Sequence, residues 1–577
     1  MGDSMKRPCV LGARVLALAA VLLFACQGIE PQLRTLMEAT DAQAGLQDFH
    51  VGPPVEVTDT GPARFVHGLF EGFQSKRAMT LVTFIDGFYR APANRGFDEV
   101  LERLQHELKE AGFGGEDARL GLEFLKVSEV EHAWTPISGK LVLMVDGEEA
   151  RELHGFTEPG DVDRVMLPIN APSCDVKGEV ALRLDDIKKG MVFVTSVPCS
   201  QVLARAANRG AAAVISCSLY PFNEDPSGAE RHLDAIQFHS HPDGETMPTA
   251  QISPRSMEAI EAAVERAAKR GSHVRLHLQA EVLTENRPLR TLMATIRGAT
   301  RPQEAVAMVS HVQEPGACDN ASGVAGLLEG ARSLAEALKA QKLPWPDRTL
   351  VFLWGDEFRQ SECWLDSTKM KPIAGISSDM TGESKDLTNA RPLLERNYDP
   401  GALKVLKPDA HTPWGAGQVD ESEIKPNGLA VIARCAMADV SMLENGTWTT
   451  AEHPWEGGSD HDKFIARGVP AILFWHFTDF TYHTSLDRLK FVDPEEMRRT
   501  DTALLATGLS VASAQPGDLD RYVDSLERER QVRVASCREV KDERMEKLWE
   551  DWCRSTRLWF RNLCLGIDEP LDAGSKK

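Results

Sequence analysis

The chain has 577 residues, of which 42% are hydrophobic and 26% charged, and its formal net charge is −21. This length exceeds the size at which one hydrophobic core stops growing, so we expect about two to four domains. The acidic balance argues against nucleic acid or an anionic membrane surface as the main partner, because both are polyanions. The composition is otherwise that of a soluble globular protein.

Residues 1–26 resemble an export signal. Basic residues precede an apolar run from Val15 to Ala25, which is too short for a membrane-spanning helix. The run ends at Cys26, as in the lipoprotein box of bacterial envelope proteins, where that cysteine becomes lipidated. Phe24 occupies a position that usually holds a small residue, so cleavage without lipidation is the alternative. We therefore expect an exported protein, anchored to the cell envelope through Cys26 or secreted.

Residues 27–150 are predicted to form the N-terminal part of the main domain. Apolar residues at helical spacing predict a helix over 97–108, and Gly112 follows as a stop signal. Residues 120–130 and 139–145 have the pattern of strands, which places them in a sheet.

Residues 151–285 alternate short strands with helices. Their Gly- and Ala-rich pattern resembles the protease-associated (PA) domain, a small module inserted in several exopeptidases. The stretch from His239 to Asp243 contains metal-ligand residue types. The adjacent Pro242 and Gly244 instead predict a solvated loop.

Residues 286–515 contain four short apolar runs that predict buried strands. An acidic or imidazole group follows each one: His311 after 305–309, Asp356 and Glu357 after 348–354, Asp379 after 373–378, and His483 after 469–474. Open α/β sheets bind ligands at the carboxyl ends of their strands. Two carboxylate-rich pockets with one imidazole each are the ligand set expected of a two-zinc hydrolytic site. Taken singly, each residue is better explained as part of a cap, a turn or a solvated loop, and only the order and position of the four sites favour a metal centre.

Asp319 lies just before a predicted helix over 324–338. Asn320 or Ser322 is suited to the N-cap of that helix, where a side-chain oxygen can accept a hydrogen bond from a free amide of the first turn. This position brings the Asp319 carboxylate to the same edge of the predicted sheet.

Five motifs then occur in one order along residues 290–510: G-A-C-D-N-A-S-G, D-E-F, D-M-T-G, G-G-S-D-H and Y-H-T-S-L-D. With them this segment resembles the catalytic domain of the zinc aminopeptidases and glutamate carboxypeptidases, metallopeptidase family twenty-eight, in which an inserted PA domain also occurs. The resemblance implies a mixed-sheet, three-layer α/β/α exopeptidase domain at 286–515 with a smaller PA-like domain inserted at 151–285.

The resemblance also implies two Zn²⁺ ions per chain. Asp319 would bridge them, and His311 with Asp379 would complete the first site. Glu357 and His483 would complete the second site. The ions would acidify a shared water and hold the oxyanion of a peptide substrate.

Asp356 stands where the family keeps a Glu as general base, and Tyr482 where several members use a Tyr hydroxyl to polarise the scissile carbonyl. Asp356 is shorter than Glu by one methylene, which draws the carboxylate back from the water. Gln313 replaces an Asp that usually orients the first imidazole, here His311. Its amide oxygen offers a weaker acceptor.

We therefore expect an exported di-zinc exopeptidase, most simply an aminopeptidase acting on peptides. A weak or inactive binding protein on the same fold is the alternative, and a glutaminyl-cyclase-like activity is a third possibility. Retention of all five ligand types favours the enzyme, because crowded carboxylates without metal repel one another. Residues 384–456 have a loop-rich pattern, and 516–577 a charged helical one that leaves their role open.

Overall fold

The computed structural model describes residues 59–567. The predicted signal, with Cys26, lies outside the described residues, as does the start of the predicted N-terminal segment. No helix within 59–567 is both long enough and apolar enough to cross a membrane.

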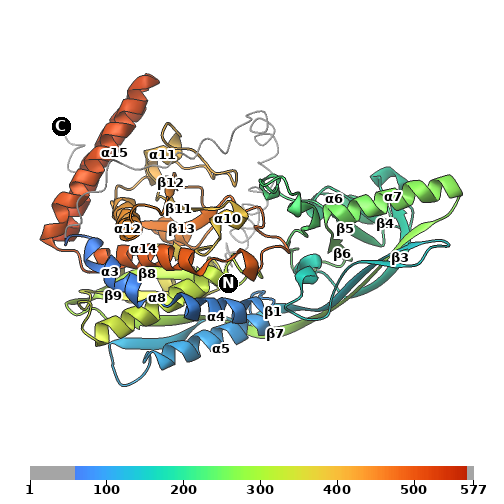
Figure 1. Ribbon diagram of the computed structural model, residues 1–577, viewed down its shortest axis with the longest axis horizontal. Coiled ribbons are helices and arrows are strands. Elements are labelled where there is room, and N and C mark those ends of the chain that lie inside the picture. The colour runs from blue at the N-terminus through green and yellow to red at the C-terminus, as the bar shows by residue number, and fades with distance from the viewer. Residues whose placement is uncertain (1–58, 568–577) are drawn as a thin grey trace, which may run out of the picture.

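One mixed sheet of 13 strands runs through the described part of the chain (Figure 1). Its centre is a parallel set in the order β13-β10-β8-β9: Ala471–Phe477, Lys371–Ser378, Arg301–His311 and Arg348–Gly355. At one edge β11 (Arg391–Glu395) pairs antiparallel with β13, and β12 (Ala451–His453) lies outside it. At the other edge β7 (Val274–Ile296) pairs antiparallel with β9.

The central strands form because their residues are apolar on both faces, as parallel strands covered by helices require. Residues of β8 and β9 alternate between two separate hydrophobic clusters, one on each face of the sheet. The prediction of a mixed α/β fold with helices on both faces is confirmed.

The first face carries α3 (Ala63–Gly72), α4 (Ser75–Asp86), α5 (Arg95–Glu110), α8 (Ala321–Lys339), α12 (Leu429–Leu443) and α14 (Pro494–Ala512). The second face carries α9 (Arg359–Ser367) and α13 (His461–Ala466). The predicted helix over 324–338 is α8, and the predicted helix over 97–108 is α5.

β1 (Leu120–Val145) and β7 form an antiparallel ribbon that leaves the main domain and runs into a second lobe (Figure 1). The two strands predicted at 120–130 and 139–145 are therefore one strand. Its pairing register shifts three times between Lys126 and Ser138, and such bulges bend a ribbon.

The second lobe has its own hydrophobic cluster around a sheet in the order β7-β3-β4-β5-β6. It contains β2 (Arg151–Phe156), β3 (Cys174–Ala181), β4 (Val192–Thr195), β5 (Ala213–Ser216), β6 (Thr249–Gln251), α6 (Cys199–Asn208) and α7 (Pro254–Arg270). Its identity as a PA domain and the predicted domain boundaries stay predictions.

One local expectation was wrong, and a second holds only in part. Residues 384–456 contain, besides β11, β12 and the short helices α10 (Lys385–Thr388) and α11 (Pro400–Leu403), the long helix α12. Residues 239–243 are exposed at Ser240, Pro242 and Asp243, whereas His241 is buried and His239 half-buried.

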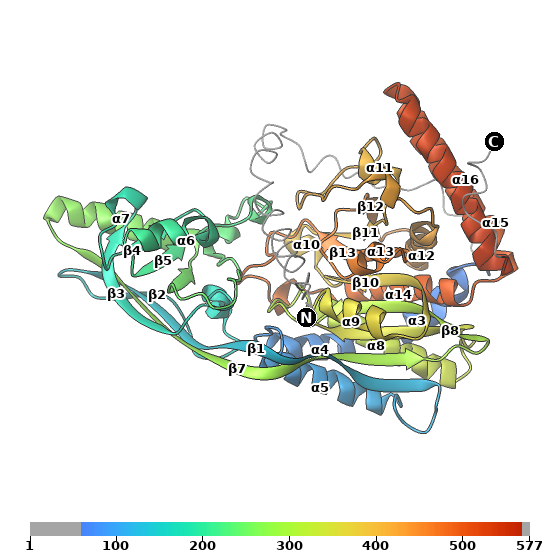
Figure 2. The same cartoon turned by 180° about the vertical axis from the view of Figure 1, so that it is seen from behind.

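The C-terminal segment forms a helical hairpin of α15 (Leu519–Glu539) and α16 (Glu543–Leu565), which packs beside α11 and α12 (Figure 2). Met545, Trp549 and Trp552 are buried in the main hydrophobic cluster, as expected for ordinary core residues. The hairpin is therefore part of the main domain.

A network of charges lies beneath this hairpin. Three arginines share four carboxylates whose side chains are no more than 4% exposed: Arg396, Arg434 and Arg533 with Asp399, Asp409, Glu452 and Glu529. The network joins the loop after β11 to α12 and α15.

Candidate metal centre

Three adjacent parallel strands deliver the predicted ligands to one edge of the sheet. His311 is the last residue of β8, Glu357 follows β9, and Asp379 follows β10. His483 lies in the loop after β13, and Asp319 directly precedes the N-cap of α8. The structure brings all five side chains together.

Asn320 holds the strand ends at a fixed separation. Its Nδ2 lies 3.2 Å from the His311 carbonyl and 3.4 Å from the Ser378 carbonyl, and its Oδ1 accepts a hydrogen bond from the Met380 amide at 2.9 Å. Asn320 occupies the N-cap position predicted for it, but its side chain makes no capping hydrogen bond. It joins β8 to β10 instead.

The first half of the centre surrounds His311. Its Nε2 lies 3.1 Å from Oδ1 of Asp379 and 3.8 Å from Oδ1 of Asp319. The donor atoms of His311, Glu357 and Asp379 all lie within 4.8 Å of one another. Oδ1 of Asp379 is buried and accepts no hydrogen bond from the residues that the structure describes.

The second half surrounds His483. Its Nε2 lies 3.0 Å from Oδ2 of Asp319 and 2.9 Å from Oε2 of Glu314. The two oxygens of Asp319 therefore face different imidazoles, and the Asp487 carboxylate accepts a hydrogen bond from the Asp319 amide at 2.9 Å. Glu314 did not appear among the residues predicted from the sequence.

Gln313 contacts two of the predicted ligands, one through its main chain and the other through its side chain. Its main-chain oxygen lies 3.1 Å from Nδ1 of His311, which leaves Nε2 of the imidazole facing the carboxylates. Its side chain instead binds Glu357: Oε1 accepts from the Glu357 amide at 2.8 Å, and Nε2 donates to Oε2 at 3.3 Å. The expected contact between the Gln313 side chain and His311 is replaced by this main-chain contact.

The electrostatics of the centre suit a cation. Burial and then the charge of Glu314 raise the pKa of Asp319 well above its usual range, and burial does the same to the pKa of Glu357. Burial disfavours protonated His311, yet the Asp379 and Glu357 charges outweigh it and raise the pKa of this imidazole. Without a bound cation, these crowded carboxylates favour their protonated forms. Such a set of oxygen donors fits a metal ion, which would replace the protons.

Asp356 lies beside the centre and is buried. Burial raises the pKa of this carboxyl to about 7, against the opposing effect of the Arg359 guanidinium. The Arg359 Nη1 atom lies 3.6 Å from Asp356 Oδ2.

The Tyr482 ring stacks on the His483 ring, with centroids 3.9 Å apart and planes 11° apart. It also packs against Phe222 and Phe477. Burial raises the pKa of Tyr482 well above its usual range, so its hydroxyl stays protonated at neutral pH. The ring is therefore fixed beside one predicted ligand.

The second lobe holds the loop that carries His483. The Phe238 amide and the Gln237 Nε2 donate to the His483 carbonyl at 2.7 and 2.6 Å. Asn223 Nδ2 donates to the Tyr482 carbonyl at 2.8 Å. No motif in the sequence identified these residues, because they act through the main chain of their targets.

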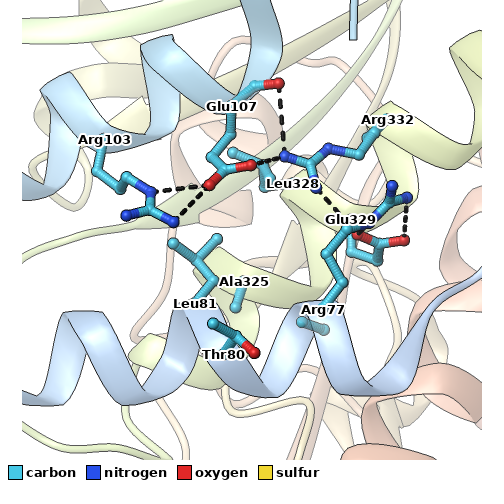
Figure 3. Close-up of a pocket in the computed structure, with 10 residues that line it drawn as sticks. Arg77, Thr80, Leu81, Arg103, Glu107, Ala325, Leu328, Glu329 and Arg332 are labelled. Carbon is cyan, nitrogen blue, oxygen red and sulfur yellow. Dashed lines mark hydrogen bonds and ion pairs between the residues drawn. The ribbon is translucent and has the colours of Figure 1, made fainter. Parts of the chain in front are cut away.

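A cavity of about 180 Å³ lies between α4, α5 and α8 (Figure 3). Its charged lining is already paired: Arg77 binds Glu329 at 2.6 Å, and Glu107 binds both Arg103 and Arg332. None of the predicted site residues lines it, so it is separate from the candidate centre.

Residues 291–408 match the model of a protein family described as Peptidase family M28. The matched range contains His311, Asp319, Asp356, Glu357 and Asp379, whereas Tyr482 and His483 lie beyond it. A search of curated proteins gave no match.

Solved structures resemble the chain at low identity. A Peptidase M28 precursor from Shewanella amazonensis has a TM-score of 0.52 at 16% identity, over 78% of this chain and 96% of that one. BSAP, a zinc aminopeptidase from Bacillus subtilis, has a TM-score of 0.49 at 15% identity, over 77% and 96%. An aminopeptidase from Aneurinibacillus sp. strain AM-1 has a TM-score of 0.45 at 17% identity, over 78% and 96%.

The family match confirms the predicted resemblance and the predicted class, a peptidase hydrolase. The Shewanella structure supports the fold alone. The roles of the individual residues stay predictions.

Proposed function

We propose, on the premise that residues 291–408 belong to peptidase family M28, that this chain is an exported di-zinc exopeptidase. It would remove N-terminal residues from peptides. The observation that carries the proposal is Asp319, which is buried and whose two oxygens face two different imidazoles among half-buried carboxylates. A carboxylate in that position is suited to bind two metal ions at once.

The donor set fits zinc, which takes imidazole nitrogen and carboxylate oxygen. His311 and Asp379 would hold one ion, His483 the other, and Asp319 both. Bound zinc supplies Lewis acidity, which lowers the pKa of a water and polarises a carbonyl. The residues around it would then move protons and orient the substrate.

Asp356 is the proposed proton acceptor. It follows β9 directly and is buried beside the centre, and its carboxylate would take a proton from the attacking water and return it to the leaving amine. The Tyr482 hydroxyl, protonated at neutral pH, would donate a hydrogen bond to the developing oxyanion.

The acidic character of the whole chain favours one end of a peptide over the other. Its formal net charge of −21 attracts the α-ammonium group of an N-terminus and repels a C-terminal carboxylate. Aminopeptidase activity is therefore proposed over carboxypeptidase activity. Location outside the cytoplasm is proposed from the export signal in residues 1–26 alone.

Zinc content and end-specificity test the proposal together. We expect purified protein to hold about two zinc ions per chain, to cleave aminoacyl p-nitroanilides, and to leave N-acetylated analogues intact. A strong chelator should abolish cleavage, and added zinc should restore it. Folded protein that neither binds zinc nor cleaves after zinc addition would favour the binding-protein alternative. Equal cleavage of acetylated and free substrates would contradict the exopeptidase assignment.

The short side chain at position 356 gives a second test. Asp356→Asn should lower kcat by about 10²-fold, at the lower end of what general bases contribute, because Asp reaches the water less well than Glu. Asp356→Glu should raise kcat above that of the wild type. Unchanged kcat in both variants, with zinc content unaltered, would remove Asp356 from the mechanism.

A further inference from the structure

We propose that Glu314 is a metal ligand in the His483 half of the centre, so that each half has its own glutamate. This inference rests on the proposed function, because it assumes that the centre holds two ions. It goes beyond the ligand set predicted from the sequence, which contains Glu357 but not Glu314.

The geometry places Glu314 at the second imidazole. Its Oε2 lies 2.9 Å from Nε2 of His483, the same nitrogen that lies 3.0 Å from Oδ2 of Asp319. Donor atoms of Glu314, Asp319 and His311 also lie within 4.8 Å of one another. One imidazole nitrogen and two carboxylate oxygens at this spacing can converge on one ion.

Glu357 lies in the His311 half, not in the His483 half to which the family resemblance assigned it. Its donor atom groups with those of His311 and Asp379, and its side chain is tied there by Gln313. The centre therefore has two similar pockets. Each contains one His and one Glu, and they share Asp319.

The chain holds Glu314 in place from several sides. Its backbone adopts φ of +80°, a region that L side chains rarely occupy, and its amide donates to the Arg90 carbonyl at 3.0 Å. The buried Arg90 guanidinium donates to the carbonyls of Val312 and Gly316, on both sides of Glu314, at 2.9 and 2.7 Å. The loop is therefore fixed in the conformation that directs this carboxylate at His483.

The charge of the site agrees with this assignment. Four carboxylates converge on two imidazoles: Glu314, Asp319, Glu357 and Asp379. With neutral imidazoles, their total charge balances that of two Zn²⁺ ions. Without Glu314, three carboxylates would face the four positive charges of two Zn²⁺ ions, and neutrality of the site would depend on a deprotonated water.

The experiment measures zinc affinity rather than activity. Glu314→Gln, Glu357→Gln and the control Glu362→Gln are titrated against a chromophoric zinc chelator, and zinc per chain is counted after dialysis. Glu362 lies on α9 and pairs with Lys463 at 2.8 Å, away from the centre. We expect Glu314→Gln to lower the affinity for one of the two zinc ions. The loss should exceed the ~10–100-fold that follows when a residue that contacts only a metal ligand is removed. The control should bind both ions normally.

Double variants identify the affected half. The double variant Glu314→Gln with His483→Gln should bind the ion of the His311 half with the same affinity as either single variant. The reason is that both substitutions remove ligands of the other ion. The double variant Glu314→Gln with Glu357→Gln should have a lower affinity for both ions. Melting temperatures of the metal-free proteins identify any variant that fails to fold.

Two results would overturn the inference. The first is a Glu314→Gln variant that binds two zinc ions with wild-type affinity. If its KM for substrates with a free N-terminus also rises, Glu314 binds substrate instead of metal. The second is weaker binding of the ion in the His311 half by the Glu314→Gln and His483→Gln double variant than by His483→Gln alone. Zinc-free wild-type protein would instead reject the proposed function, so the two failures are distinguishable.

Discussion

Asp319→Asn should remove both zinc ions and lower kcat/KM on aminoacyl p-nitroanilides by at least about 10³-fold. Metal ions contribute several kcal/mol of transition-state stabilisation, and each 1.36 kcal/mol corresponds to about tenfold in rate. The substitution keeps the shape of the side chain but removes the negative charge that both halves of the centre share. Zinc counted per chain and initial rates measure the effect.

The same change elsewhere serves as the control. Asp366→Asn alters an exposed carboxylate on α9, paired with Arg467 at 2.7 Å, and should leave both zinc content and rate unchanged. Removal of only one ion by Asp319→Asn, with the other bound at wild-type affinity, would contradict the bridging role.

Arg396→Met should destabilise the main domain by about 3–5 kcal/mol, the usual cost of breaking a buried charge pair. The Arg396 side chain is 1% exposed and binds Asp399 at 2.6 Å and Asp409 at 2.8 Å. Met fills similar volume but leaves these carboxylates buried without their main partner. Chemical unfolding, followed by fluorescence of the buried tryptophans, measures the loss.

Arg538→Met is the matched control. Arg538 lies at the end of α15, where its side chain is 64% exposed and pairs with Glu546. Its loss should leave the unfolding midpoint unchanged, since solvent screens exposed pairs. Equal midpoints for Arg396→Met and wild type would mean that the carboxylates of the network are protonated and need no partner.

The sequence predicted the parts of the fold that have strong local patterns. The runs 305–309, 348–354, 373–378 and 469–474 are mostly apolar, and the structure has a central strand at each. α12 was missed for a related reason. It is apolar around nearly its whole circumference, so it lacks the one-sided periodicity that distinguishes a surface helix.

The predicted ligands lie together because four of them end or follow strands of one parallel set, and the fifth, Asp319, lies in the turn after β8. Glu314 was missed because its contact with His483 crosses 169 positions and depends on a backbone angle that no local pattern encodes. Gln237 and Phe238 were missed because their partner is a main-chain carbonyl, which every residue has. Contacts of this kind can only be found once the chain is folded.

The length of the ribbon formed by β1 and β7 determines where the second lobe lies relative to the candidate metal centre. The 26 residues of β1 span about 85 Å at ~3.3 Å per residue, and side chains alternate faces along it. A one-residue slip would turn every later side chain to the opposite face and shift residues 237–238 away from His483. The number of residues in the two strands therefore fixes the position of residues 237–238 relative to His483 in the candidate centre. Length variation among relatives should therefore fall in the turns at its outer end, such as 146–150, rather than along the strands.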